Sequence, residues 1–136
     1  MVCAYCSNET QVTNSRHQKR NNNVWRRRQC QVCQSVFTTI EAIDYSSVFR
    51  ITVQGDFKPF LTDLLYTEVL LALSDRKNAY MDAREITNAI IKTLSKMPAS
   101  PLFKPSDISK VTASVLQKFD KRAWHRYAAE HPSVAS

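Results

Sequence analysis

The chain has 136 residues, of which 43% are hydrophobic, and it carries a formal net charge of +7. A chain of this length forms one ordinary domain or two small ones, and no apolar run approaches the roughly 18 residues of a membrane span. Met1-Val2 leaves no room for a basic and then apolar leader before Cys3, so we expect a cytoplasmic protein with no membrane partner.

All four cysteines lie in two Cys-x2-Cys pairs that are separated by 23 residues. Each pair places two thiolates about one turn apart, so two pairs can close a tetrahedral site of four sulfurs. The first 45 residues contain few large aliphatic side chains, and structural zinc can supply the missing folding free energy, on the order of 10 kcal/mol. Two disulfides or four unbonded thiols are the alternatives, but in the cytosol paired cysteines are more often metal-bound. The sequence therefore predicts one Zn²⁺ per chain, held by Cys3, Cys6, Cys30 and Cys33.

The stretch between the cysteine pairs is basic, with six Lys or Arg residues and no acid from Gln11 to Cys30. Two β-prone segments flank a polar tip with three consecutive asparagines, which accept positive φ values, so a strand, a turn and a second strand are predicted. Unopposed cations of this kind are typical of nucleic-acid-binding surfaces, and a solvated arm is the alternative. The predicted DNA contacts are Arg16, Lys19, Arg20, Arg26, Arg27 and Arg28.

Trp25 stands directly before the three consecutive arginines. In a strand, alternation puts Arg26 and Arg28 on one face and Trp25 and Arg27 on the other. The arginines can bind phosphates or guanine edges, and Trp25 can stack on bases or wedge between them. The alternative role for Trp25 is to cover a small core in the zinc module. We include Trp25 among the predicted DNA-binding residues.

Residues 35–41 are β-rich and are predicted to complete a three-stranded ribbon. Together with the two cysteine pairs, three further motifs resemble the N-terminal zinc ribbon of the NrdR family of bacterial repressors of ribonucleotide reductase genes. These motifs are Asn14-Ser15-Arg16, Arg26-Arg27-Arg28 and Phe37-Thr38-Thr39-x-Glu41. The chain departs from the family at several positions. Ala4 and Val32 stand where the family favours proline, Asn14 where it has aspartate, and Gln34 where it has glycine. Trp25 and Val36 stand where the family has arginine. The resemblance implies binding to a double-stranded promoter operator in the bacterial cytoplasm, on the nucleoid.

A polar connector over residues 44–47 predicts two domains, a zinc ribbon over residues 1–46 and a second domain over 47–136. The second domain begins with an alternating strand over residues 49–53, a turn at 54–56 and an extended segment at 57–60. Residues 100–104 are predicted to be a loop. Helical periodicity predicts four helices, the first capped by Thr62 or Asp63 and the others beginning at Asp82, Ser106 and Asp120; the last ends at His131-Pro132. The fold class is therefore α+β, in two small domains.

The end of the chain is similar to the closing helix of the ATP-cone, the domain that follows the ribbon in NrdR proteins. The similar segment is Phe119-Asp120-x-x-Ala123-Trp124-x-Arg126-Tyr127-Ala128. The resemblance implies a β-hairpin plus about four helices, with ATP or dATP as effectors that control assembly of a homo-oligomer.

The nucleotide-binding positions of the ATP-cone are altered in this chain. The family has Lys-Arg-Asp-Gly and a later lysine where this chain has Thr52-Val53-Gln54-Gly55 and Leu64, so only the glycine is retained. A triphosphate needs Lys, Arg or backbone donors nearby. Two outcomes stay open, a nucleotide-responsive cone and a cone that no longer senses nucleotide. The other residues that we consider for this site are Arg50, Lys58 and Phe60.

We therefore expect a zinc-dependent DNA-binding transcriptional repressor and not an enzyme. The three histidines have no partnered carboxylate motif, the sequence lacks a P-loop, and the cysteines are predicted to hold metal. The alternative is a zinc-ribbon interaction module that binds RNA, single strands or a larger complex.

Overall fold

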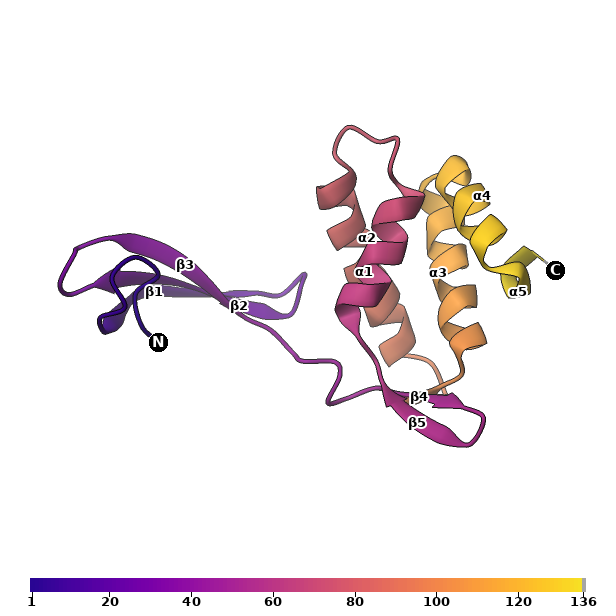
Figure 1. Ribbon diagram of the computed structural model, residues 1–136, viewed down its shortest axis with the longest axis horizontal. Helices are drawn as coiled ribbons and strands as arrows, with labels where there is room; N and C mark the ends of the chain where they lie inside the picture. The colour runs from indigo at the N-terminus through magenta and orange to yellow at the C-terminus, as the bar shows by residue number, and fades with distance from the viewer. Residues whose placement is uncertain (136) are drawn as a thin grey trace. The chain divides into compact units, whose positions relative to one another are not determined.

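The computed structural model describes residues 1–135 and divides into two compact units (Figure 1). The first unit covers residues 1–43, and the second begins at Asp44. The sequence placed this boundary at residue 46. The first unit is a sheet and the second is mostly helical, in agreement with the predicted α+β class.

The first unit contains a three-stranded antiparallel sheet with the order β1-β2-β3. Its strands are β1 (Thr10–Gln18), β2 (Asn23–Cys30) and β3 (Val36–Glu41), which confirms the predicted ribbon. Asn22, in the turn between β1 and β2, has a φ of 48°, a conformation that asparagine tolerates well. The register shifts between Val12 and Asn14, and there the Thr13 hydroxyl donates to the Arg27 carbonyl at 3.3 Å.

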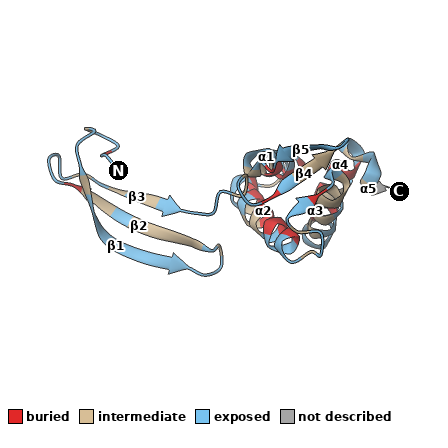
Figure 2. Cartoon of the chain, turned by 90° about the horizontal axis from the view of Figure 1, so that it is seen from below, coloured by how far each residue is buried: buried red, intermediate tan, exposed pale blue. Residues whose placement is uncertain are grey.

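This sheet has almost no apolar core. Of residues 1–43, all of which the structure describes, only Cys3 and Cys30 are buried. Figure 2 shows β1 as mostly exposed, with half-buried positions concentrated in β2. Burial of hydrocarbon therefore cannot be the main source of stability for this unit.

The second unit contains a smaller sheet with the order β5-β4-β6. Strands β4 (Arg50–Val53) and β5 (Asp56–Pro59) form a hairpin. Its two-residue turn, Gln54-Gly55, has φ values of 52° and 89°, which favours glycine at the second position. The third strand, β6 (Leu102–Phe103), pairs in parallel with β4. The prediction of a plain loop at residues 100–104 was therefore wrong, because two residues are too few to produce a periodic pattern.

Five helices complete the described part of the second unit: α1 (Thr62–Ala72), α2 (Ala79–Ser95), α3 (Pro105–Phe119), α4 (Lys121–Glu130) and α5 (Pro132–Ala135). Asp120 caps α4, as predicted, by accepting from the backbone N–H groups of Arg122 and Ala123. The other predicted helix starts were wrong by a few residues. Helix α4 ends at Glu130, directly before His131-Pro132, as predicted, and Pro132 begins the further short helix α5.

The misplaced helix starts have visible causes. The Asp82 carboxylate accepts from the Arg76 guanidinium at 2.7 Å, and α2 begins before it, at Ala79. At the start of α3, Asp107 accepts from the backbone N–H of Lys104, and Pro105 takes the first helical position, where its missing N–H costs nothing. Leu61 precedes α1 without a side-chain cap.

Three aromatic rings join the small sheet to the helices. Phe49, Phe60 and Phe103 are at most 2% exposed. The ring of Phe49 meets those of Phe60 and Phe103 nearly edge to face, at centroid distances of 5.4 and 5.3 Å. None of the helices within residues 1–135 is both long enough and apolar enough to cross a membrane.

Replacing Phe103 by Ala should lower the free energy of unfolding of the second unit by about 3–5 kcal/mol, because it leaves a cavity among these rings. Urea unfolding followed by helical circular dichroism measures this change. Phe57→Ala is the matched control, since Phe57 is 65% exposed and its loss should cost less than about 1 kcal/mol. Equal losses for the two variants would contradict this description of the core.

Candidate metal centre and nucleic-acid interface

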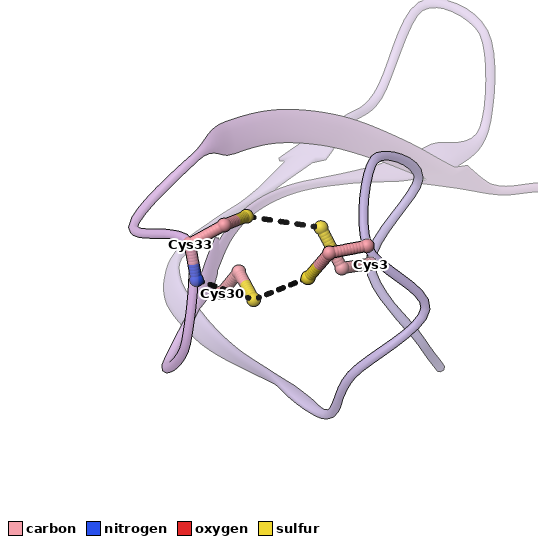
Figure 3. A group of neighbouring side chains, drawn as sticks. Cys3, Cys30 and Cys33 are labelled. Carbon is pink, nitrogen blue, oxygen red and sulfur yellow. Dashed lines mark hydrogen bonds between the residues drawn. The ribbon is translucent and has the colours of Figure 1, made fainter.

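The four cysteine sulfurs converge between two loops of the first unit, and their ligand atoms all lie within 4.8 Å of one another. Figure 3 shows Cys3 facing Cys30 and Cys33 across the site. The sulfurs of Cys3 and Cys33 are 3.7 Å apart, and those of Cys6 and Cys30 are 3.4 Å apart. Tetrahedral zinc with Zn–S bonds of about 2.3 Å places sulfurs about 3.8 Å apart. The four thiols are free, so the donor set fits zinc and not a pair of disulfides.

Backbone amides support the first sulfur of each cysteine pair. The N–H of Tyr5 donates to Cys3 Sγ at 3.4 Å, and the N–H groups of Val32 and Cys33 donate to Cys30 Sγ at 3.4 and 3.5 Å. The two loops thus repeat one arrangement. These donors orient the sulfurs and stabilise negative charge on them.

Ser35 links the two halves of the site through its hydroxyl, which lies 3.3 Å from Cys3 Sγ and 2.9 Å from Cys33 Sγ. This contact is the largest cause of a Cys3 pKa lowered to about 6, and the N–H groups of Tyr5 and Cys6 act in the same direction. A lowered pKa favours the thiolate, which is the form that binds metal.

The other cysteines show opposing effects. The Asn8 side-chain amide donates to Cys6 Sγ at 3.3 Å and is the main reason that the pKa of Cys6 is lowered. At Cys30 the amide of Cys33 lowers the pKa, but burial and the neighbouring sulfurs of Cys6 and Cys33 raise it, and the net direction is upward. Negative charge on the buried Cys30 sulfur is therefore unfavourable next to other thiolates, and a bound divalent cation would offset this repulsion.

Sequence reasoning missed both Ser35 and Asn8. Each lies two residues after the second cysteine of its pair, which is the signal that could have identified them. The residues between, Ser7 and Gln34, have φ values of 61° and 60°. This left-handed conformation turns the chain back, so that the following side chain faces the sulfurs.

The pairing register of the sheet divides the predicted DNA-binding residues between its two faces. On one face Trp25 lies between Arg16 and Ile40. In the next row of the same face, Arg27 lies between Asn14 and Thr38. We call this surface the reading face; it consists of Asn14, Arg16, Trp25, Arg27, Thr38 and Ile40.

The opposite face carries Arg26, Arg28 and Cys30. The Arg26 guanidinium donates to Ser15 Oγ at 2.9 Å and pairs with the Glu41 carboxylate at 3.1 Å. Arg28 donates to the hydroxyls of Thr39 and Thr10 at 3.4 and 3.3 Å. These two arginines therefore brace the sheet.

The side chains of the reading face have fewer such partners. Arg16 and Arg27 are exposed and Trp25 is half-buried. Glu41 is the single acid among the described strand residues of the first unit, and it belongs to the opposite face. Lys19 and Arg20 are exposed at the turn between β1 and β2. Among the six residues of the reading face, Arg16 and Arg27 thus carry positive charge and no residue is acidic.

The residues considered for nucleotide binding lie on the β4–β5 hairpin and at the start of α1. The structure separates their environments. Phe60 is 2% exposed in the core, so its ring is not accessible for stacking on a purine. Gln54 and Gly55 form the hairpin turn. Arg50 and Lys58 are exposed, and Arg50 donates to the Ser46 carbonyl at 2.8 Å.

The three positions where the family has cations offer no charge to a triphosphate. The Thr52 hydroxyl donates to the Phe103 carbonyl at 3.3 Å, Val53 is half-buried, and Leu64 is 61% exposed. Phosphate oxygens need converging cations or N–H donors. The side chains at these positions therefore do not fit a nucleoside triphosphate held in the family's manner.

A shallow cleft of about 260 Å³ lies elsewhere in the second unit, between α1 and α2. It contains none of the residues considered for nucleotide binding. Its lining residues are Thr62, Asp63, Tyr66, Arg84, Thr87 and Asn88.

Comparison with known proteins gives a consistent set of relatives. The family described as "Transcriptional repressor NrdR-like, N-terminal domain" matches residues 1–41. The transcriptional repressor NrdR of Ehrlichia canis (strain Jake) is 34% identical over 131 residues, covering 95% of this chain and 84% of the relative. Transcriptional repressor NrdR 3 of Paramagnetospirillum magneticum is 33% identical over 131 residues, with the same coverage of 95% and 84%. The transcriptional repressor NrdR of Variovorax paradoxus (strain S110) is 33% identical over 137 residues, covering 98% of this chain and 90% of the relative.

Replacing Ser35 by Ala should weaken zinc affinity by about 10-fold to 100-fold, the usual effect of losing a partner that hydrogen-bonds metal ligands. Competition with a chromogenic chelator measures the affinity. Ser7→Ala is the control, because Ser7 is the exposed serine of the first cysteine loop. Unchanged affinity in the Ser35 variant would contradict the role given to its hydroxyl.

Proposed function

The chain belongs to the family of NrdR-like transcriptional repressors, and from this premise we propose that it represses transcription by binding double-stranded promoter DNA through its zinc ribbon. Following the family resemblance, the regulated genes are those of ribonucleotide reductase. The protein then acts in the bacterial cytoplasm, on the nucleoid.

The positive charge on the reading face is the main support for this proposal. Arg16 and Arg27 project from neighbouring strands of a rigid sheet, with Asn14 and Thr38 beside them and no acid on the same face. Guanidinium groups bind phosphate oxygens and guanine edges, and amide and hydroxyl groups bind either phosphates or bases. Lys19 and Arg20 add positive charge at the tip of the β1–β2 hairpin.

Zinc has a structural role in this proposal. Cys3, Cys6, Cys30 and Cys33 hold it as thiolates, and bound zinc supplies the folding free energy that the missing apolar core does not. No catalytic step is assigned to any of these cysteines. Loss of zinc should therefore remove DNA binding by unfolding the reading face.

The second unit is proposed to assemble the repressor as a homo-oligomer. Its own core makes it an independent folding unit, and oligomerisation would bring several ribbons to one operator. Of the two outcomes that the sequence left open for ATP or dATP, we propose a cone that no longer senses nucleotide. The support is the lack of cationic side chains at Thr52, Val53 and Leu64.

Replacing Arg16 and Arg27 together by Ala should weaken duplex binding and reduce the slope of log K against log[salt] by about 1.8, since each phosphate contact contributes about 0.9. Fluorescence anisotropy with a promoter duplex at several salt concentrations measures both quantities. The zinc content should stay the same, because neither side chain contacts a cysteine sulfur.

The charge-matched control is Arg84→Ala with Arg122→Ala, two exposed arginines of the second unit. An equal loss of slope in this control, or no loss in the Arg16 and Arg27 variant, would show that the wrong surface was chosen. Random duplex and single strand serve as competitors. Equal affinity for all three nucleic acids would favour the alternative of a general nucleic-acid interaction module.

Millimolar ATP or dATP with Mg²⁺ should leave both the sedimentation coefficient and the duplex affinity of the zinc-loaded protein unchanged. The reason is that Thr52, Val53 and Leu64 carry no positive charge, whereas the family has Lys, Arg and Lys at these positions. The variant to compare is one that restores the three cations, Thr52→Lys with Val53→Arg and Leu64→Lys. A nucleotide-dependent shift in the unmodified protein would contradict the loss of sensing.

A further inference from the structure

Trp25 occupies a position that the zinc site does not explain. Strand β2 runs without a register shift against β3, so residues 25 and 30 point to opposite faces of the sheet. The buried sulfur of Cys30 is therefore on the face away from Trp25. This placement argues against the alternative that Trp25 covers the core of the zinc module.

Trp25 instead has a polar and exposed environment on the reading face. Its direct cross-strand neighbours are Arg16 on β1 and Ile40 on β3. Arg16 is exposed, and Ile40 is 59% exposed. Side chains directly opposite in antiparallel strands have Cβ atoms about 5 Å apart, so the indole and Ile40 form one small apolar area beside a guanidinium.

This apolar area is unusual because the first unit buries so few side chains. Trp25 is half-buried in a unit whose buried residues are Cys3 and Cys30. Arg27 lies two residues along the same strand and face, so cations stand on two sides of the indole. An aromatic ring between cations matches the chemistry of a nucleic-acid base between its two phosphates.

The number of aromatic rings decides between a single-strand platform and a duplex wedge. Proteins that bind single strands stack successive bases on several aromatic side chains. Among the described strand residues of the first unit, the other aromatic is Phe37, which pairs with Arg28 and so lies on the opposite face. Tyr5 is 72% exposed, but it belongs to the loop of the first cysteine pair and not to the sheet. One ring next to one branched aliphatic side chain fits insertion at a single base step of a duplex.

We propose that Trp25, extended by Ile40, contacts the bases of duplex DNA directly by inserting at one base step, and so kinks the operator. This inference rests on the proposed function and adds a source of sequence preference to it. Flexible pyrimidine–purine steps are the least costly to open, so the preferred operator should contain one at the contact. Arg16 and Arg27 hold the phosphates on either side of that step.

The intrinsic fluorescence of the protein tests this contact. The chain has two tryptophans, and Trp124→Phe leaves Trp25 as the sole emitter. Duplex should quench its emission saturably and protect it from acrylamide. In the protein with Trp124 intact, Trp25→Ala should lower duplex affinity by about 10-fold while leaving the salt slope and the zinc content unchanged, because indole carries no charge.

A duplex labelled at both ends reports the kink by energy transfer, and the Trp25→Ala complex should be straighter than that of the unmodified protein. Duplex binding with unchanged emission, or with unchanged affinity in the Trp25 variant, would overturn this inference while leaving the proposed function intact. Failure to bind duplex at all would instead overturn the proposed function. Tighter, equally quenched binding to single strand would replace the wedge with a stacking platform.

Discussion

The shared coordination of one metal ion by four cysteine sulfurs is the constraint on which the first unit depends. The first unit, in which Cys3 and Cys30 are the buried residues, cannot offset its loss of conformational entropy by apolar burial. The amides of Tyr5, Val32 and Cys33, together with the Ser35 hydroxyl, prepare the sulfurs for a cation. A metal that holds the sheet from the side of Cys30 leaves the reading face available for the proposed DNA contact.

That separation explains why the basic residues of the ribbon are not equivalent. Arg26 and Arg28 lie on the face of the zinc ligand Cys30, where Glu41 and threonine hydroxyls hold their guanidinium groups. Arg16 and Arg27 lie on the reading face, where no acid competes with phosphate. The sheet thus divides a stripe of like charge in the sequence. Arg26 and Arg28 brace the sheet, and Arg16 and Arg27 belong to the surface that we propose to bind DNA.

Much of this arrangement was predictable because it depends on local signals. Cysteine spacing predicted the metal site, the asparagine tip and Gly55 predicted two turns, and Asp120 predicted a helix cap. The rest depends on contacts between distant segments. Strand β6 exists only through pairing with β4, Ser35 reaches a sulfur 32 residues away, and Arg26 meets Glu41 only once β2 and β3 are in register. Alternation correctly separated Trp25 from Arg26, but only the pairing register shows which neighbours each one has.

We propose that zinc holds the reading face in shape and that the reading face binds DNA. Stepwise removal of zinc with a chelator, followed on one sample by metal content, promoter-duplex anisotropy and helical circular dichroism, tests both links together. Metal and duplex binding should be lost together, while the helical signal of the second unit persists. Duplex binding that survives complete loss of zinc would contradict this proposal.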